Sequence, residues 1–463
     1  MFGPANAVDA PKLIHGVGFP VAGTSHSRVS DLEPYLEAVH RSGAPWASEH
    51  LSFNQARDGF DEARSRGYFG GFLLPPIQSP QAVKVAAANI RAVKNLLPVP
   101  FAFETGVNYF GRLPGEMTDG AFFSAIAEES DCGILLDLHN LWCNERNGRQ
   151  AVLDVLAELP LDRVWEVHLA GGSEVDGLWL DSHAGAPPEP LYDLAEKVLP
   201  LLPNLGAVVF EVTPEMVGRG RFSATAVLDQ LRRIRGIWER TAAARAACTA
   251  AALAADMPEP TGSRPRISVA TVLSDPGPED RDSEDHSPAA EGPTKSSLPD
   301  PARWESVVAS LAAGIPVAPA DDGGFAETLG ADRAVPTLQR LVASFRSGVV
   351  ATALPLTFRM IMFAAGEEGF NELMRGFWRE NTPRRFPAEE LDAFLDHLEA
   401  GGAAIPHLAE VAAYEMAVRR VAATDAEQRV RFTCEPVALL GSLARYEAPQ
   451  PGAPGEYEVV VKP

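Results

Sequence analysis

The stretch VWEVHLAGGSEVDGLWLDSH, residues 164–183, joins a strand-like apolar run to three polar side chains. His168 stands at the end of the run, and Asp181 and His183 follow on the next loop. A hydrophobic core needs none of these side chains, because a buried polar group costs free energy unless it is paired. The stretch therefore predicts a buried strand whose end carries chemistry as well as packing.

The same pattern recurs along residues 10–245. Short β-rich apolar runs alternate with segments of helical spacing, such as residues 30–43 and 79–97. This alternation indicates a parallel sheet covered by helices, and six or more such units favour an α/β fold of the TIM (β/α) barrel type over an open sheet. The predicted strands are LIHGVGF (13–19), WASEHLSF (46–53), VPFAFETGV (99–107), GILLDLHNLW (133–142), VWEVHLAGG (164–172) and LGAVVFEVTP (205–214).

Two further zones follow the predicted barrel. Residues 257–302 are rich in Pro, Ser, Gly, Asp and Glu and show no periodicity, which is typical of a disordered acidic linker. Residues 303–463 begin with helical patterns and end with the strand-like pieces RVRFTCEP and GEYEVVVKP. We therefore expect a barrel over 1–245, a linker over 246–302, and a mainly helical C-terminal domain with a small β tail over 303–463.

Charge and composition limit the partners of the chain. Its 463 residues include 62 acidic and 40 basic ones, which gives a net charge of −22. Such a surface repels phosphate backbones and anionic lipids, so we expect neither nucleic acid nor membrane as a partner. The longest apolar stretch, residues 348–366, is interrupted by Pro355 and Arg359 and predicts a buried helix. Four scattered cysteines and an N-terminus without a signal-peptide pattern predict a cytoplasmic protein.

Metal-capable side chains end the predicted strands, where the βα loops of a barrel form active sites. In chain order they are His15, Glu49, His50, Glu104, Asp137, His139, Asn140, His168, Asp181, His183 and Glu211. Carboxylates that converge on one barrel mouth repel one another unless cations lie between them. The donors are imidazole, carboxylate and amide, without thiolate, so the pattern predicts two or three Zn, Fe or Mn ions bridged by carboxylates.

Eight short pieces resemble the DUF692 family of multinuclear non-haem iron oxidases, which includes the enzyme subunit of methanobactin biosynthesis. They are HGVGFPVAG, SEHLSF, LLPPIQSP, ETGVNYF, CGILLDLHN, EVHLAGG, LDSHAGAP and FEVTPE, spread over residues 13–215. The wider fold resembles the xylose-isomerase-like barrels, among them the endonuclease IV enzymes with a trinuclear zinc site. This resemblance implies the metal ligands His15, His50, Glu104, Asp137, Asn140, His168, Asp181, His183 and Glu211.

The resemblance also implies individual roles. Asn140 matches an amide that favours iron over zinc, Glu104 would bridge two ions, and Glu49 would handle protons or support a ligand. We count Glu49, Glu104 and His139 as catalytic candidates, because His139 would supply a histidine where the family has an asparagine. The chain departs from the family at HLAGG, where Gly172 replaces the usual histidine, and it begins near the family's third strand. The barrel would then lack its first βα units, or the true start would lie further upstream.

The C-terminal zone adds a second resemblance and completes the functional prediction. Residues 345–421 resemble DUF2063-type partner proteins, which help present a precursor peptide; an unrelated helical bundle is the alternative. Together the resemblances imply oxidative modification of a ribosomally synthesised precursor peptide, at cysteine, by mixed Fe(II)/Fe(III) ions. O2 would be the co-substrate and the partner domain would be supplied in cis. A zinc phosphodiesterase of the endonuclease IV type, a metal-dependent sugar isomerase and a peptide-binding scaffold with structural metals stay open as alternatives.

Overall fold

The computed structural model describes residues 9–25, 29–57, 67–212, 217, 222–255, 298–318, 320, 323–401 and 404–463. The chain divides into two compact units. Unit 1 comprises Met1–Asn54, Leu73–Glu305 and Asp321–Ala334, and unit 2 comprises Gln55–Phe72, Ser306–Ala320 and Val335–Pro463. Of the predicted linker, residues 256–297 lie outside the described part. The three domain ranges expected from the sequence stay a prediction.

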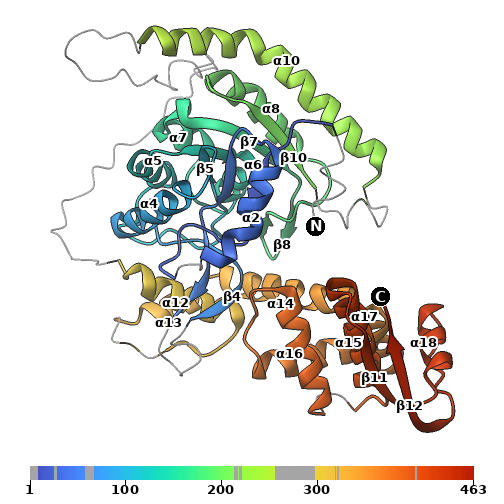
Figure 1. Cartoon of the computed structure of the whole chain (residues 1–463). Coiled ribbons are helices and arrows are strands. Elements are labelled where there is room, and N and C mark those ends of the chain that lie inside the picture. The colour runs from blue at the N-terminus through green and yellow to red at the C-terminus, as the bar shows by residue number, and fades with distance from the viewer. Residues whose placement is uncertain are drawn as a thin grey trace. The chain divides into compact units, whose positions relative to one another are not determined.

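Unit 1 is built on a six-stranded parallel sheet whose strands follow one another in chain order. Strands β5, β7 and β10 of this sheet are labelled in Figure 1. Every neighbouring pair is parallel, as expected from the alternation of strand and helix patterns. Among the described residues, the first and last strands form the two edges, so the sheet is an open, curled half-barrel. The strands are β1 (Ile14–Gly16), β2 (Ala47–His50), β5 (Phe101–Glu104), β6 (Gly133–Asp137), β7 (Val164–Ala170) and β10 (Ala207–Glu211).

Helices alternate with these strands, and local sequence signals explain where they begin. Helix α4 starts directly after Ser79, whose hydroxyl accepts a hydrogen bond from the backbone N–H of Ala82 at 3.2 Å, and Pro80 occupies the first helical turn. The helices of unit 1 are α2 (Val29–Ser42), α4 (Pro80–Lys94), α5 (Asp119–Ser130), α6 (Leu138–Arg146), α7 (Val152–Glu158), α8 (Glu189–Val198), α10 (Ala224–Ala255) and α13 (Phe325–Gly330), with 3-10 turns η1 (Leu161–Arg163) and η2 (Leu199–Leu201).

The central strands β5, β6 and β7 are buried on both faces of the sheet, which explains their continuous apolar runs. All five residues of β6, GILLD, are buried. Residues that follow the predicted linker also enter this core: Trp304 is 1% exposed, its ring lies 5.6 Å from that of Phe110, and its indole N–H donates to the carbonyl of Pro75 at 2.8 Å. Two two-stranded sheets complete the strands: β3 (Phe53–Ala56) pairs with β4 (Tyr68–Leu74), and β8 (Ser173–Val175) pairs with β9 (Leu178–Leu180) in antiparallel direction.

Unit 2 is mainly helical with a small β tail, as the sequence predicts. Its helices pack around a core that includes Phe377, Phe394 and Phe432, all at most 1% exposed. Strands β11 (Gln428–Cys434) and β12 (Pro454–Val461) form the antiparallel tail. The helices are α14 (Ala334–Ala353), α15 (Pro355–Glu380), α16 (Pro387–Glu399), α17 (Leu408–Thr424) and α18 (Pro436–Ala444), and α12 (Pro301–Ala313) begins in unit 1 and ends in unit 2.

Membrane-spanning potential is limited among the described helices. None is long and apolar enough to cross a bilayer by itself. Helices α14 and α15 meet the length and composition criteria only as a pair, and that pair is bent by 109°.

Candidate metal centre

The register of the sheet places the predicted site residues side by side at the carboxyl ends of the strands. His50 at the end of β2 lies opposite Glu104 on β5, and Asp137 on β6 lies opposite His168 on β7. Glu211 is the last residue of β10. Neighbouring parallel strands end at the same edge of a sheet, so residues far apart in the chain meet in one place.

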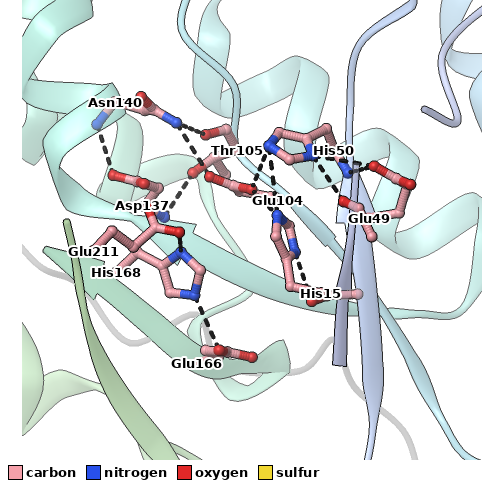
Figure 2. A network of polar contacts seen from close by, with 12 residues as sticks. His15, Glu49, His50, Glu104, Thr105, Asp137, Asn140, Glu166, His168 and Glu211 are labelled. Carbon is pink, nitrogen blue, oxygen red and sulfur yellow. Dashed lines mark hydrogen bonds and ion pairs between the residues drawn. The ribbon is translucent and has the colours of Figure 1, made fainter. Parts of the chain in front are cut away.

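A first group of donors consists of His15, His50 and Glu104 (Figure 2). The Nε2 atoms of the two imidazoles lie 3.4 Å apart. Glu104 Oε2 lies 2.9 Å from Nε2 of His15 and 3.3 Å from Nε2 of His50. Two imidazole nitrogens and a carboxylate oxygen that face a common point form a donor set suited to a divalent transition metal.

A second group shares Glu104 with the first. It consists of Glu104, Asp137, His168 and Glu211, whose donor atoms all lie within 4.8 Å of one another. Nδ1 of His168 lies 3.2 Å from Glu211 Oε1. Glu104 belongs to both groups and so links the two sets of donors.

Asp181 and His183 extend the second group through Glu211. Nε2 of His183 lies 3.2 Å from Asp181 Oδ1 and 3.3 Å from Glu211 Oε2. His183 has a backbone φ of 49°, in the left-handed region that a histidine seldom adopts, and the adjacent Ala184 N–H donates to Gly171 O at 2.8 Å. The loop after β9 thus holds the imidazole of His183 toward the carboxylates.

Five buried polar atoms at this site form no hydrogen bond of good geometry among the described residues; three of them lie in the ion-pair contacts given above, and Asp137 Oδ2 and Asn140 Oδ1 have no ion-pair contact either. The five atoms are Glu104 Oε2, Asp137 Oδ2, Asn140 Oδ1, His168 Nδ1 and Glu211 Oε2. All five are lone-pair donors on predicted ligands, and buried polar atoms are rarely left without a partner. The remaining atoms of the same side chains are engaged: Asp137 Oδ1 accepts from the backbone N–H of Asn140 at 2.7 Å, and the Asn140 amide donates to Glu104 Oε1 at 3.2 Å. The donor set therefore fits metal ions.

Polar neighbours hold each ring of the two main groups with its free nitrogen toward the centre. Nδ1 of His50 donates to the carbonyl of Gly16 at 3.0 Å and lies 3.1 Å from Glu49 Oε1, which leaves Nε2 for a metal. Nδ1 of His15 contacts Ser48 Oγ at 2.9 Å in the same way. Metal-ligating histidines commonly donate their second nitrogen to a carbonyl or carboxylate, because this fixes the tautomer.

His168 shows the same arrangement with the opposite nitrogen. Its Nε2 donates to Glu166 Oε1 at 3.0 Å, and Trp46 Nε1 donates to Glu166 Oε2 at 2.8 Å. Nδ1 of His168 is therefore the atom left for a metal. Figure 2 shows Glu166 and Glu49 on the outer side of the histidines that they contact.

His139 lies at the site but both of its ring nitrogens already have partners. Nδ1 is 3.0 Å from Asp181 Oδ1, and Trp179 Nε1 donates to Nε2 at 3.1 Å. A Cβ on Gly172 would lie 2.7 Å from His139 Nε2, so this imidazole fills space next to the glycine of HLAGG. The structure thus links two departures from the family pattern: the histidine at 139 occupies the room beside the glycine at 172.

Electrostatics at the site follow from burying many carboxylates together. Burial, and then the charges of Glu104 and Glu211, raise the pKa of Asp137 well above its usual range. Burial alone would lower the pKa of His50, but the Glu104 and Glu49 carboxylates outweigh it and raise that pKa to about 9. Protons thus compensate the negative charge in the absence of other cations, and metal ions that bind here would displace them.

The structure brings all nine predicted ligands into this network, with Glu49 and His139 beside them. Glu166, Ser48 and Trp179 contact the predicted residues and were not singled out as polar groups in the sequence. Glu166 carries one signal that sequence reasoning could have used: it precedes His168 by two residues and so lies on the same face of the strand. Cys143 is buried with a raised pKa, first through burial, which fits a core thiol.

Comparisons with known proteins agree with these motifs. The family model described as RiPP precursor modification enzyme MbnB/TglH/ChrH matches residues 5–217; RiPP denotes a ribosomally synthesised and post-translationally modified peptide. A UPF0276 protein of Streptomyces avermitilis is 33% identical over 180 residues, which cover 39% of this chain and 37% of the relative. A UPF0276 protein of Chromobacterium violaceum is 30% identical over 176 residues, 38% of this chain and 60% of the relative.

The chain thus spans less than two thirds of the length of these two relatives. The UPF0276 protein of Neisseria meningitidis serogroup C is 29% identical over 203 residues, 43% of this chain and 69% of the relative. A solved structure of L-ribulose 3-epimerase shows 15% identity and a TM-score of 0.32, over 54% of this chain and 80% of that one. Residues 5–217, which carry these motifs, thus match the MbnB/TglH/ChrH family of RiPP precursor modification enzymes.

Proposed function

We propose that this chain is a metal-dependent enzyme that oxidatively modifies a ribosomally made precursor peptide, at cysteine, with two or three iron ions and O2. The observation that carries the proposal is the convergence of nine donor side chains with five buried lone-pair atoms that form no hydrogen bond of good geometry among the described residues. The family match of residues 5–217 supports a peptide-modifying enzyme.

The donor set supports the choice of metal. The described donors are imidazole, carboxylate and one amide, which suit Fe, Zn and Mn. His15, His50 and Glu104 would hold one ion, and Glu104, Asp137, His168 and Glu211 a second. Asn140, Asp181 and His183 would complete the second position or hold a third ion. Iron bound here would supply redox chemistry with O2 and a Lewis acid that binds and acidifies a substrate thiol.

The side chains around these donors orient the donor rings, hold Asp181 in position and anchor the loop that carries His183. Glu49, Ser48 and Glu166 fix the tautomer and orientation of the ligating rings. The imidazole of His139 holds Asp181 in position while Trp179 fixes the imidazole's own tautomer. Asp181 N–H donates to the phenol oxygen of Tyr109 at 3.1 Å, which anchors the loop that carries His183.

The C-terminal part of the chain would present the peptide. The resemblance to DUF2063-type partners suggests a presenting domain supplied in cis. A covalent connection raises the effective concentration of one part at the other without any new contact. We take this arrangement as part of the proposal.

Metal content and peptide-dependent O2 uptake test the proposal. Protein purified in air should contain iron, and it should consume O2 when it is given the cysteine-containing peptide encoded beside its own gene. Zinc alone would favour the endonuclease IV-like phosphodiesterase. Turnover of a free sugar would favour the isomerase, and bound peptide without O2 uptake would favour the scaffold.

Two ligand variants and a matched control sharpen this test. His50→Ala and Glu104→Ala should each lose at least one equivalent of metal, measured by elemental analysis, and should lose activity. His40→Ala, at an exposed position on α2, should keep both. Full metal content in either ligand variant would show that the ligand assignment is wrong.

A further inference from the structure

Unit 2 contains a cavity that has no part in the metal centre. It has a volume of about 610 Å³ and lies between the end of α12 and the helices α14 and α15. Four of its lining residues are arginines: Arg340, Arg346, Arg375 and Arg379. The described lining includes neither Asp nor Glu.

The arginines differ in how their charge is compensated. Arg346 is 3% exposed, its Nε donates to Glu390 Oε1 at 2.6 Å, and its Nη2 donates to Asn381 O at 2.8 Å. Arg375 and Arg379 are both exposed. Arg379 Nε donates a hydrogen bond to the backbone carbonyl of Arg375 at 3.3 Å, which leaves the charge of both guanidinium groups uncompensated by this contact. Like charges around one cavity repel one another, and an anion between them removes that repulsion.

Trp378 supplies a second, independent observation. It lines the same cavity, and its buried indole N–H has no hydrogen-bond partner among the described residues. An indole N–H donates only, so a bound acceptor group would satisfy it. The guanidinium of Arg346 lies 5.8 Å from the Trp378 ring centroid, which places a cation and an unused donor at one site.

The size and walls of the cavity narrow the class of anion. Sites of roughly 300–1,000 Å³ take ligands much larger than a phosphate ion. The apolar lining residues Ala312, Val342 and Ala343, together with the Trp378 ring, offer surface for an apolar group beside the charges. A nucleic acid is disfavoured because the described lining offers a single aromatic ring, that of Trp378, on which a base could stack.

We propose that this arginine pocket, defined by Arg340, Arg346, Arg375, Trp378 and Arg379, binds an acidic peptide segment. Carboxylates of the segment pair with Arg375 and Arg379, and a neighbouring apolar side chain packs on Trp378. The assignment of that segment to the precursor peptide rests on the proposed function, whereas the preference for an acidic peptide does not. The pocket would then select substrates by acidic residues far from the modified one.

Fluorescence anisotropy with defined peptides tests the proposal. The probe is a fluorescein-labelled peptide of sequence EELEEL, compared with QQLQQL and KKLKKL, on the full chain. The acidic peptide should bind, and a double variant, Arg375→Glu with Arg379→Glu, should weaken binding by at least about tenfold because charge-assisted hydrogen bonds are lost. A control double variant, Arg419→Glu with Arg431→Glu, at exposed positions on α17 and β11, makes the same change of charge and should bind within about twofold of the natural chain.

Two further measurements exclude competition by the chain's own acidic residues and by a nucleotide. The chain carries its own acidic stretch, EDRDSED at 279–285, so the assay is repeated on a chain whose acids there are replaced by Asn and Gln. Failure of EELEEL to bind both chains, equal binding of QQLQQL, or displacement by ATP at lower concentration than unlabelled EELEEL would each overturn the proposal. Metal content is measured in parallel, because loss of peptide binding with unchanged metal separates a failure here from a failure of the proposed function.

Discussion

Glu49 shows how a single buried charge can act through a neighbour. Its side chain is completely buried, and its carboxylate accepts hydrogen bonds from the backbone N–H groups of Phe19 and His50 as well as facing His50 Nδ1. A Cβ at position 16 would lie 2.6 Å from Glu49 Oε2, so Gly16 is required for this approach. The geometry is that of a support for a metal ligand, reached through the ring of His50.

Glu49→Gln should therefore weaken metal binding without unfolding the chain. An amide keeps the size of the side chain but loses the charge that supports His50, and such supporting contacts are worth roughly 10–100-fold in metal affinity. Competition with a chelator of known affinity measures the change. Glu37→Gln, on the exposed face of α2 with Arg41 as its partner, should leave the affinity unchanged; equal affinities of all three proteins would contradict this role.

Gly172→Ala should destabilise the chain although it adds one methyl group. The new Cβ would lie 2.4 Å from Trp179 Nε1 and 2.5 Å from the backbone oxygen of Leu180, besides its approach to His139. Overpacking of this kind costs roughly 1–3 kcal/mol. Urea denaturation measures the loss, and Gly18→Ala, where a Cβ would meet nothing within 4 Å, should stay within about 0.5 kcal/mol of the natural chain.

At this scale the sequence predicts the residues that converge at the candidate site better than the residues that hold them in place. His15, Glu104 and Glu211 were visible because each stands at the end of an apolar run, where a barrel gathers its chemistry. Glu166 and Trp179 were not visible in the sequence, because their roles depend on contacts with His168 and His139. Such pairings are long-range, and a local pattern does not contain them.

Helix α15 illustrates how one element completes another. Its first turn has no capping side chain of its own, and Glu415 on α17 accepts hydrogen bonds from the N–H groups of Leu356 and Thr357 at 2.7 and 2.8 Å and from the Thr357 hydroxyl at 2.7 Å. These N–H groups have no partner within the helix. Glu415 thus joins the two helices and supplies the missing hydrogen-bond acceptors for the first turn of α15.

Glu415→Ala should cost about 2 kcal/mol or more, because it removes a cap and leaves buried donors without an acceptor. Chemical denaturation followed by circular dichroism measures it. The matched control is Glu427→Ala, whose exposed partner is Arg429 and whose loss should cost at most about 1 kcal/mol. A cost no greater than that of the control would mean that solvent replaces the cap.

Helix α12 carries a carboxyl group that makes stability depend on pH. Burial raises the pKa of Glu305 to about 7, although the N–H of Thr24 donates to it at 2.8 Å and the Thr24 hydroxyl donates as well. Between pH 4.5 and 7 the folded chain keeps a proton that the unfolded chain has lost. Its contribution to stability therefore falls as pH rises through this window, by up to about 3 kcal/mol.

Glu305→Gln should remove this dependence. At pH 5 the free energy of unfolding of the variant should be equal to or lower than that of the natural chain. At pH 8 the difference should shift in favour of the variant, because an amide has no proton to lose. Urea midpoints of both proteins at the two pH values give the difference directly. A constant difference across the range would show that Glu305 does not titrate in it.

Elements were predicted from periodicity with uneven success. The six sheet strands and helices α2 and α4 follow from local patterns, as does the order of helices and tail in unit 2. The pair β8 and β9 was expected as a loop, although Asp176 and Gly177 between them both have positive φ, the signature of an Asp-Gly hairpin turn. Residues 55–57 and 67–72 belong to unit 2 because of packing far along the chain, which no local pattern shows.

The chain returns to unit 1 after the stretch that was predicted as a linker. Trp304 is buried against Phe110, Asp332 accepts from the N–H of Gly111 at 3.1 Å, and Arg333 Nη2 donates to Asn147 O at 2.6 Å. These contacts are all internal to unit 1. Cleavage between residues 260 and 295 would therefore separate two pieces of one folded unit.

We expect the two fragments to stay associated after such a cut. A cleavage site placed between residues 260 and 295 should yield fragments that elute together in size-exclusion chromatography and separate only in denaturant. Trp304→Ala should weaken their association, because truncating a buried Trp typically costs about 3–5 kcal/mol. Fragments that part freely without denaturant would mean that these contacts are too weak to hold them.

Two carboxylates at the candidate metal centre each belong to two adjacent donor groups. Glu104 is shared by the first and second groups, and Glu211 lies in the second group and contacts His183 of the Asp181–His183 pair. Occupancy of one position would orient such a carboxylate for the next, so successive ions should bind with rising affinity. Protein with only some of its metal positions occupied would then be scarce. A native mass spectrum recorded during metal titration should show mainly metal-free protein and protein with every position occupied.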